Sequence, residues 1–169
     1  MRFKLAAALV LVCLAARIVG AAEPIRVVVW DERQPKQKQA YPDFLGNQIA
    51  RALGVRPGLS VKSVALDDAG QGISERVLDQ CDVLIWWGHV RQGLIKPDQG
   101  KRIVERIQAG KLSLIALHSA HWSTPFIEAM NARSKEDALK QVPATARDRA
   151  VLRLLPPDPP LYRAPSRSA

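Results

Sequence analysis

Short apolar runs with few polar residues mark this chain as one that forms a buried sheet. Residues 25–30 (IRVVVW), 82–87 (DVLIWW) and 112–117 (LSLIAL) are rich in Val, Ile, Leu and Trp. Runs of this kind are typical of strands buried on both faces of a parallel sheet. Residues 60–66 alternate more regularly, which predicts a further strand nearer the sheet edge.

Segments of helical spacing separate these strands. The spacing predicts helices from Pro42 to a stop at Gly54, after Ser74, over residues 97–109 before a Gly110 cap, and over residues 123–130. Because strands alternate with helices, we expect an α/β fold. Its core is an open parallel sheet of about four strands with helices on both faces, and the order 2-1-3-4 is the one that we consider for it. We expect one surface of so small a sheet to be poorly covered.

The first 22 residues have the pattern of a secretory signal peptide. Arg2 and Lys4 precede an apolar run over residues 5–16, and small residues end the segment near Ala22. The run is shorter than the roughly 20 residues that a membrane-spanning helix needs, so an uncleaved anchor is the less favoured alternative. The sequence therefore predicts a periplasmic or secreted protein with no stable membrane anchor after cleavage.

The mature chain is expected to contain an α/β domain over residues 23–131, followed by a different kind of segment. Residues 134–141 and 145–154 are compatible with helices, and repeated prolines then close the chain in an extended tail within residues 132–169. The net charge of +9 is concentrated in residues 1–22 and 132–169. Since no basic stripe is interleaved with aromatic side chains, the sequence argues against nucleic-acid binding.

Cys81 is the only cysteine after the signal segment, which excludes an intramolecular disulfide. Its position directly before an apolar strand favours a small buried residue over a reactive nucleophile.

Polar side chains with useful chemistry follow three of the four predicted strands. Asp31 and Glu32 follow the first, His89 follows the third, and His118 and His121 follow the fourth. In the order 2-1-3-4 the first and third strands flank the switch point of the sheet, where α/β proteins bind ligands. We therefore expect these groups to line one crevice.

Two chemistries suit this set of residues. Neutral imidazoles with a carboxylate could hold zinc or another divalent ion, with His89, His118 and His121 as ligands. Histidine can instead act as general acid or base near neutral pH. Trp87 and Trp122 could stack against a sugar ring.

Ser119 lies at a strand-to-helix turn, where a hydrolase would place its nucleophile. That turn requires small residues two positions to either side, and here these are Leu117 and His121. A serine hydrolase using Ser119 is thus a further alternative that the local sequence does not favour.

The segments IRVVVWDE, LDQCDVLIWWGH and LIALHSAHWS resemble the ThuA-like family, named for trehalose utilisation and related in fold to class I glutamine amidotransferases. The resemblance implies a flavodoxin-like α/β fold and a role in carbohydrate metabolism, on trehalose-type or keto-sugar substrates. It also implies catalytic or substrate-binding roles at the strand ends. The catalytic set is His89, His118, His121 and Glu32, and the substrate-binding set is Asp31, Trp87, Ser119 and Trp122. Ser119 replaces the amidotransferase cysteine, so glutaminase activity is not implied.

Members of that family usually continue beyond the point where this chain enters its Pro-rich tail. We therefore expect an incomplete C-terminal part and a half-built site. The alternative to a sugar-modifying enzyme is a non-catalytic sugar-binding protein or an inert remnant. An exposed sheet edge would favour a homodimer.

Overall fold

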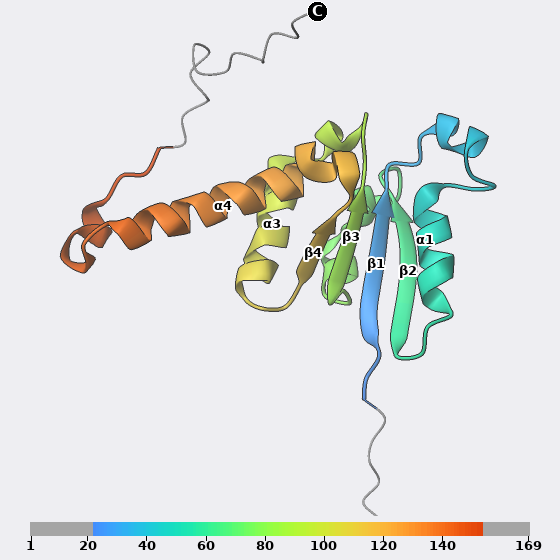
Figure 1. Cartoon of the computed structure of the whole chain (residues 1–169), viewed down its shortest axis with the longest axis horizontal. Helices are drawn as coiled ribbons and strands as arrows, with labels where there is room; N and C mark the ends of the chain where they lie inside the picture. The colour runs from blue at the N-terminus through green and yellow to red at the C-terminus, as the bar shows by residue number, and fades with distance from the viewer. Residues whose placement is uncertain (1–21, 154–169) are drawn as a thin grey trace, which may run out of the picture.

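The computed structural model describes residues 22–153. The proposed signal segment, apart from Ala22, and the Pro-rich tail lie outside these residues. Four strands form one sheet, and their bounds are β1 Ile25–Asp31, β2 Leu59–Ala65, β3 Val83–Trp87 and β4 Ser113–Ala116. All neighbours pair in parallel in the order β2-β1-β3-β4 (Figure 1). The predicted fold class, an α/β protein with a flavodoxin-like open sheet, is confirmed.

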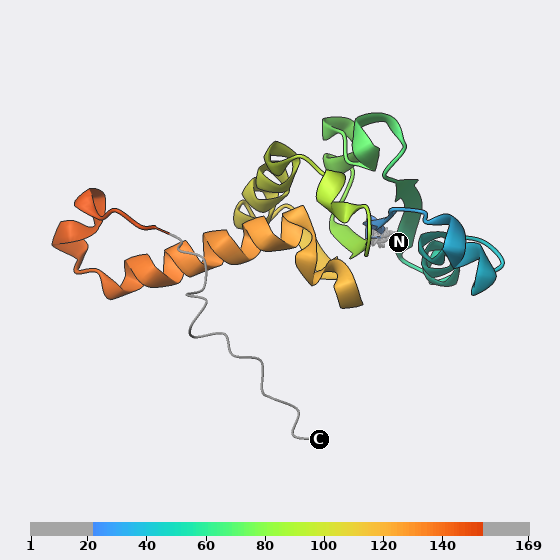
Figure 2. The same ribbon diagram turned by 90° about the horizontal axis from the view of Figure 1, so that it is seen from above.

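Helices connect the strands on both faces. The α-helices are α1 Leu45–Gly54, α2 Glu75–Leu78, α3 Pro97–Gln108 and α4 Thr124–Gln141. Short 3-10 helices occupy the loops: η1 Pro35–Gln39, η2 Ala69–Gly72, η3 Gln92–Leu94, η4 His118–Trp122 and η5 Ala144–Arg149. Seen from above, α1 lies on one side of the sheet and α2 and α3 lie on the other (Figure 2).

The alternation of side chains along the strands divides the core between these two faces. Val28, Trp30 and Trp86 belong to the larger cluster, which packs against α2 and α3. Val27 and Val29 face the opposite way and pack against α1. Buried side chains on both faces of the central strands are what continuous apolar runs predict.

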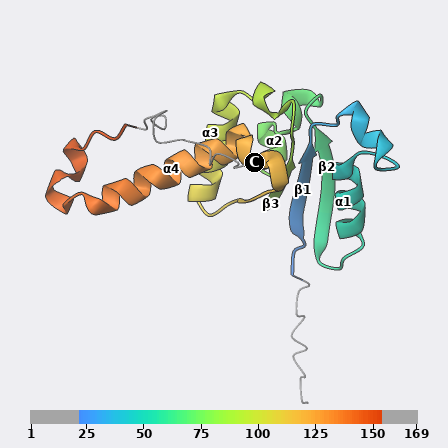
Figure 3. The same cartoon turned by 45° about the horizontal axis from the view of Figure 1, so that its top comes forward.

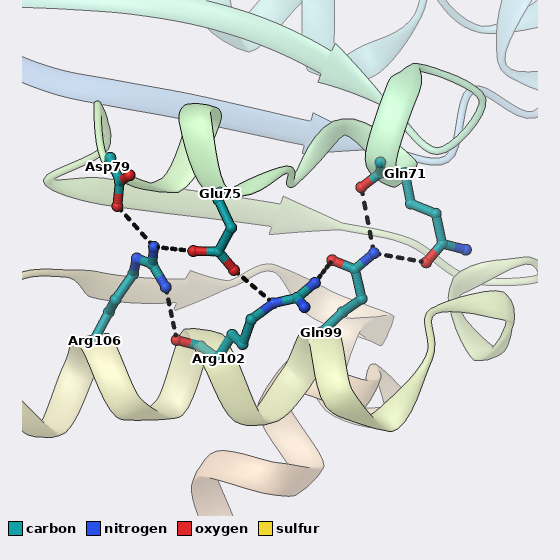
Figure 4. Close-up of polar contacts among 7 residues, drawn as sticks. Gln71, Glu75, Asp79, Gln99, Arg102 and Arg106 are labelled. Atoms are coloured by element: carbon teal, nitrogen blue, oxygen red, sulfur yellow. Dashed lines mark hydrogen bonds and ion pairs between the residues drawn. The ribbon is translucent and has the colours of Figure 1, made fainter.

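Helix α3 is fixed to α2 by a network of ion pairs (Figure 4). One guanidinium nitrogen of Arg106 lies 2.5 Å from the Glu75 carboxylate and 2.7 Å from that of Asp79. The Nε of Arg102 lies 2.8 Å from the second oxygen of Glu75. These contacts orient the one-turn helix α2, which is too short to hold its place by its own hydrogen bonds.

Helix α4 differs from the sequence-based expectation. Instead of ending near Asn131 and restarting at Ser134, it continues to Gln141, and its distal half projects away from the sheet (Figures 1 and 2). The first part packs across α3 at Gly100, where an added Cβ would lie 2.9 Å from a Thr124 methyl carbon. No Pro or Gly interrupts residues 126–141, so the helix has no reason to stop at Asn131.

Other boundaries shift by a few residues. Helix α1 begins at Leu45 rather than Pro42, and the segment after Pro143 forms the 3-10 helix η5 instead of an α-helix. Ser123 is the N-cap residue of α4, but its buried hydroxyl has no hydrogen-bond partner. None of the helices within residues 22–153 is long and apolar enough to cross a bilayer.

The sheet is left partly uncovered on the side of α1, which packs on β1 and β2. Ile115 of β4 is consequently 46% exposed. The expectation of a poorly covered surface is confirmed.

Candidate functional site

The loops that follow β1, β3 and β4 lie together along the carboxyl edge of the sheet (Figure 3). His89, His118 and His121 are all exposed there, whereas Asp31 and Glu32 have no exposed surface. The edge therefore has two layers, a buried layer of carboxylates and an exposed layer of imidazoles.

Asp31 anchors the region after β1. Its carboxylate accepts hydrogen bonds from the Gly46 amide at 2.7 Å, the Gln37 side chain at 2.9 Å and the Arg33 amide at 2.8 Å. A negative charge at the start of α1 is stabilised by the amides and dipole of that helix. Gly46 is required for this approach, because a Cβ there would lie 2.5 Å from the Cβ of Asp31.

Glu32 fixes the loop that follows β3. One carboxylate oxygen accepts the Val90 amide at 2.9 Å and the Gln34 side-chain amide, and the other accepts the Arg91 amide at 2.7 Å. Both carboxylate oxygens of Glu32 therefore accept hydrogen bonds from groups of the protein itself. This arrangement places Glu32 beneath the His89 loop as a support for it, and a catalytic role for Glu32 stays a prediction.

Gly88 turns the chain out of β3, although its backbone is not in the left-handed region. Glycine is needed for space: a Cβ there would lie 2.9 Å from the Gln92 Oε1 and 3.3 Å from a Glu32 carboxylate oxygen. The reason for this glycine is thus close packing and not the backbone freedom that the sequence suggested.

Ser119 is buried, and its hydroxyl donates a hydrogen bond to the Gly88 carbonyl at 2.8 Å. None of the described histidines hydrogen-bonds this hydroxyl. A nucleophilic serine needs an adjacent base. The geometry is that of a structural donor and gives no support to a serine hydrolase.

The backbone is strained on both sides of this edge. His118 has a φ of 44° and Arg33 a φ of 48°, both in the left-handed region that non-glycine residues rarely adopt. Such residues cost of order 1–3 kcal/mol and cluster at functional sites. His118 therefore has an enforced conformation at the end of β4.

Trp122 and Trp87 are the two predicted sugar-stacking residues, and both lie at this edge. Trp122 is 69% exposed and its ring centroid lies 5.1 Å from that of His121, with the planes tilted by 49°. Trp87 is half-buried. Trp122 thus offers an open aromatic surface beside an imidazole.

The arrangement does not fit a metal ion held by three protein ligands. Within residues 22–153, no three His, Cys, Asp or Glu side chains lie close enough together to hold one. The Nδ1 of His121 lies 3.1 Å from the His118 carbonyl oxygen, a contact that involves this nitrogen only and leaves Nε2 for other partners. We therefore derive no step through a metal, and the zinc site stays a prediction.

Several hollows in the surface lie away from the histidines. Two of about 330 and 390 Å³ surround Arg26 near the amino ends of the strands. Two others of about 330 and 360 Å³ lie between α3 and α4. The histidine loops line none of these four hollows.

Sequence reasoning missed two glutamines that organise the edge. Gln37 joins Asp31 to the start of α1, and Gln92 joins the loops after β3 and β4. Both are buried. Nothing in their neighbouring residues signals this, because their partners are distant in sequence or belong to the backbone.

The fold and the edge define an α/β protein with a histidine-bearing surface at the carboxyl edge of a parallel sheet. No protein-family model matches this chain, and no curated protein matches its sequence.

Proposed function

We propose that this protein is an exported, ThuA-like protein that binds a sugar at the carboxyl edge of its sheet and acts on a keto-sugar through its histidines. The observation that carries the proposal is the joint exposure of three imidazoles and Trp122 on strand-end loops that buried polar groups hold in place. An exposed indole suits stacking against the apolar face of a sugar ring.

In this proposal the imidazoles perform proton transfer. A neutral histidine takes a proton from the carbon beside a keto group, and the electron pair of that C–H bond forms the enolate. A second, protonated histidine donates a hydrogen bond to the keto oxygen. Return of the proton to the opposite face of that carbon inverts its configuration and completes an epimerisation, so the proton balance closes without a further reactant. Histidine is suited to both roles because it titrates near neutral pH.

The test is turnover of a panel of keto-glycosides by the full chain, with and without added zinc or manganese. We expect wild-type turnover and a loss of at least about 100-fold in His89→Ala and His118→Ala, the usual contribution of a general acid or base. Lys62→Ala, on the edge strand β2, is the control and should leave turnover unchanged. Equal turnover in the histidine variants would refute the assignment.

The exposure of Trp122 also favours a second candidate, a sugar-binding protein without catalysis. Retained sugar binding that Trp122→Ala abolishes, with no product under any metal supplement, would support this alternative over the enzyme.

A further inference from the structure

Two loops at the carboxyl edge are joined by a reciprocal pair of hydrogen bonds. The Ser119 hydroxyl donates to the Gly88 carbonyl at 2.8 Å, and the Gln92 side-chain amide donates to the Ser119 carbonyl at 2.9 Å. Each loop thus gives one side chain to the backbone of the other. We call this arrangement of Gly88, Gln92 and Ser119 the clasp.

The clasp is buried, and its geometry leaves little freedom. Gln92 is 4% exposed and Ser119 is 6% exposed. The Gln92 Oε1 is buried without a partner, which is a costly arrangement for a carbonyl oxygen. The unpaired Oε1 is tolerated because the nitrogen of the same side-chain amide bridges the loops that carry His89 and His118.

The loop after β3 is held from its other side as well. Glu32 accepts the Val90 and Arg91 amides, so the residues next to His89 are fixed to the end of β1. The guanidinium of Arg91 pairs with Asp67 at 2.6 Å, which ties the loop to the end of β2. Without the clasp, these contacts would hold the His89 loop to β1 and β2 but not to the turn that contains His118.

We propose that Gln92 is a positioning residue that sets the separation between the His89 loop and the His118–His121 turn. The reason for positioning these histidines rests on the proposed function, but the experiment below does not depend on that function. Gln92 touches no substrate; it acts through the Ser119 backbone, whose neighbour His118 is already held in a strained conformation.

The chain has three histidines, so imidazole carbon–proton NMR signals can be followed individually in the full-length protein. Gln92→Leu keeps the approximate volume but removes the donor. We expect the His89 and His118 signals to shift or broaden.

The matched control is Gln99→Leu, since Gln99 is also buried but bonds the Gly70 carbonyl on the α3 side of the sheet. This variant should leave all three imidazole signals in place. If Gln92→Leu does the same, the positioning role is refuted.

A second variant keeps the test decisive if Gln92→Leu does not fold. Ser119→Ala removes only the hydroxyl and leaves the carbonyl that Gln92 uses. We expect a smaller shift of the same two imidazole signals, and unchanged signals would refute the clasp. Sugar binding by the wild-type chain separates the two ideas. Shifted imidazole signals in the variants, with no sugar binding by the wild type, support the clasp and reject the proposed function; unshifted signals with sugar binding by the wild type do the opposite.

Discussion

The indole rings of Trp30 and Trp86 stack in the core, with their centroids 3.9 Å apart and their planes inclined by 13°. The two residues are direct partners in the pairing of β1 with β3. Both are completely buried. They differ in one respect: the Trp30 indole donates to the Gln71 carbonyl at 2.8 Å, whereas the Trp86 indole nitrogen has no partner.

This difference predicts unequal costs for the same substitution. Trp30→Phe loses packing and a hydrogen bond, but Trp86→Phe loses packing and removes an unpaired donor. We expect the free energy of unfolding to fall by about 1 kcal/mol more in Trp30→Phe. Urea titrations of both variants measure it, and equal losses would show that the Gln71 bond contributes nothing.

Substitution by alanine should change the stability of the protein in opposite directions at Gly88 and at Gly54. At Gly88 an alanine Cβ would meet Gln92 at 2.9 Å, so we expect Gly88→Ala to destabilise the protein by about 1–3 kcal/mol. At Gly54, the last residue of α1, nothing lies within 4 Å, and Gly54→Ala should stabilise by about 0.4–1 kcal/mol. Thermal unfolding of the pair checks both, and a tolerated Gly88→Ala would contradict the close packing around Glu32.

The negative charge of Glu32 should contribute to the stability of the protein. Glu32→Gln keeps the shape but weakens the bonds to the Val90 and Arg91 amides, and we expect a loss of about 1.5–3 kcal/mol in stability. Glu105→Gln, on the exposed surface of α3, is the control and should change little. Equal stability of the two variants would mean that the buried carboxylate does not hold the loop.

Cys81 should be inert in the folded protein. Burial raises the pKa of its thiol to about 11, so the thiolate is scarce at pH 8. We expect no reaction with a thiol reagent until denaturant is added, and full reaction afterwards. Because the folded pKa is raised, stability should fall as the pH rises through about 8.5 towards 11. Rapid labelling without denaturant would contradict this burial.

The ion pair between Arg26 and Asp82 predicts that the stability of the protein falls at acidic pH. The hydrogen bond from Arg26 lowers the pKa of the Asp82 carboxyl to about 2. The pKa of Asp82 is lower in the folded state than its unfolded value of about 3.9, so its charge stabilises the fold above that pH. This contribution is lost as the pH falls to about 2. Asp82→Asn should therefore be less stable than wild type at pH 6, and the two should converge near pH 2 in urea titrations. A difference that persists at pH 2 would point to packing and not charge.

The strands and the parallel sheet follow from the apolar runs, because burial on both faces leaves a strong local pattern. The strand order does not follow from the runs, and it agrees with the flavodoxin-like fold that the resemblance implies. The roles of Asp31, Glu32 and Ser119 do not follow in the same way. Their position after a strand is visible in the sequence, but their partners come from other loops, and only the fold shows that these three side chains are buried. The exposed positions of the three histidines also depend on packing.

Helix α4 shows a different limit. Its polar composition after Asn131 suggested a new segment, yet the backbone has no residue that breaks a helix there. The composition of a helix reflects whether solvent or protein surrounds it. The residues that break a helix, Pro and Gly, determine where it ends.

The central position of β1 also affects how the chain assembles. β1 pairs with β2 on one side and with β3 on the other, so its second neighbour becomes available only after Trp87 has been synthesised. The core therefore forms through contacts between distant parts of the sequence, which slows folding relative to a helical bundle. A nascent chain of this order cannot complete its sheet until Ala116, the last residue of β4, has been synthesised.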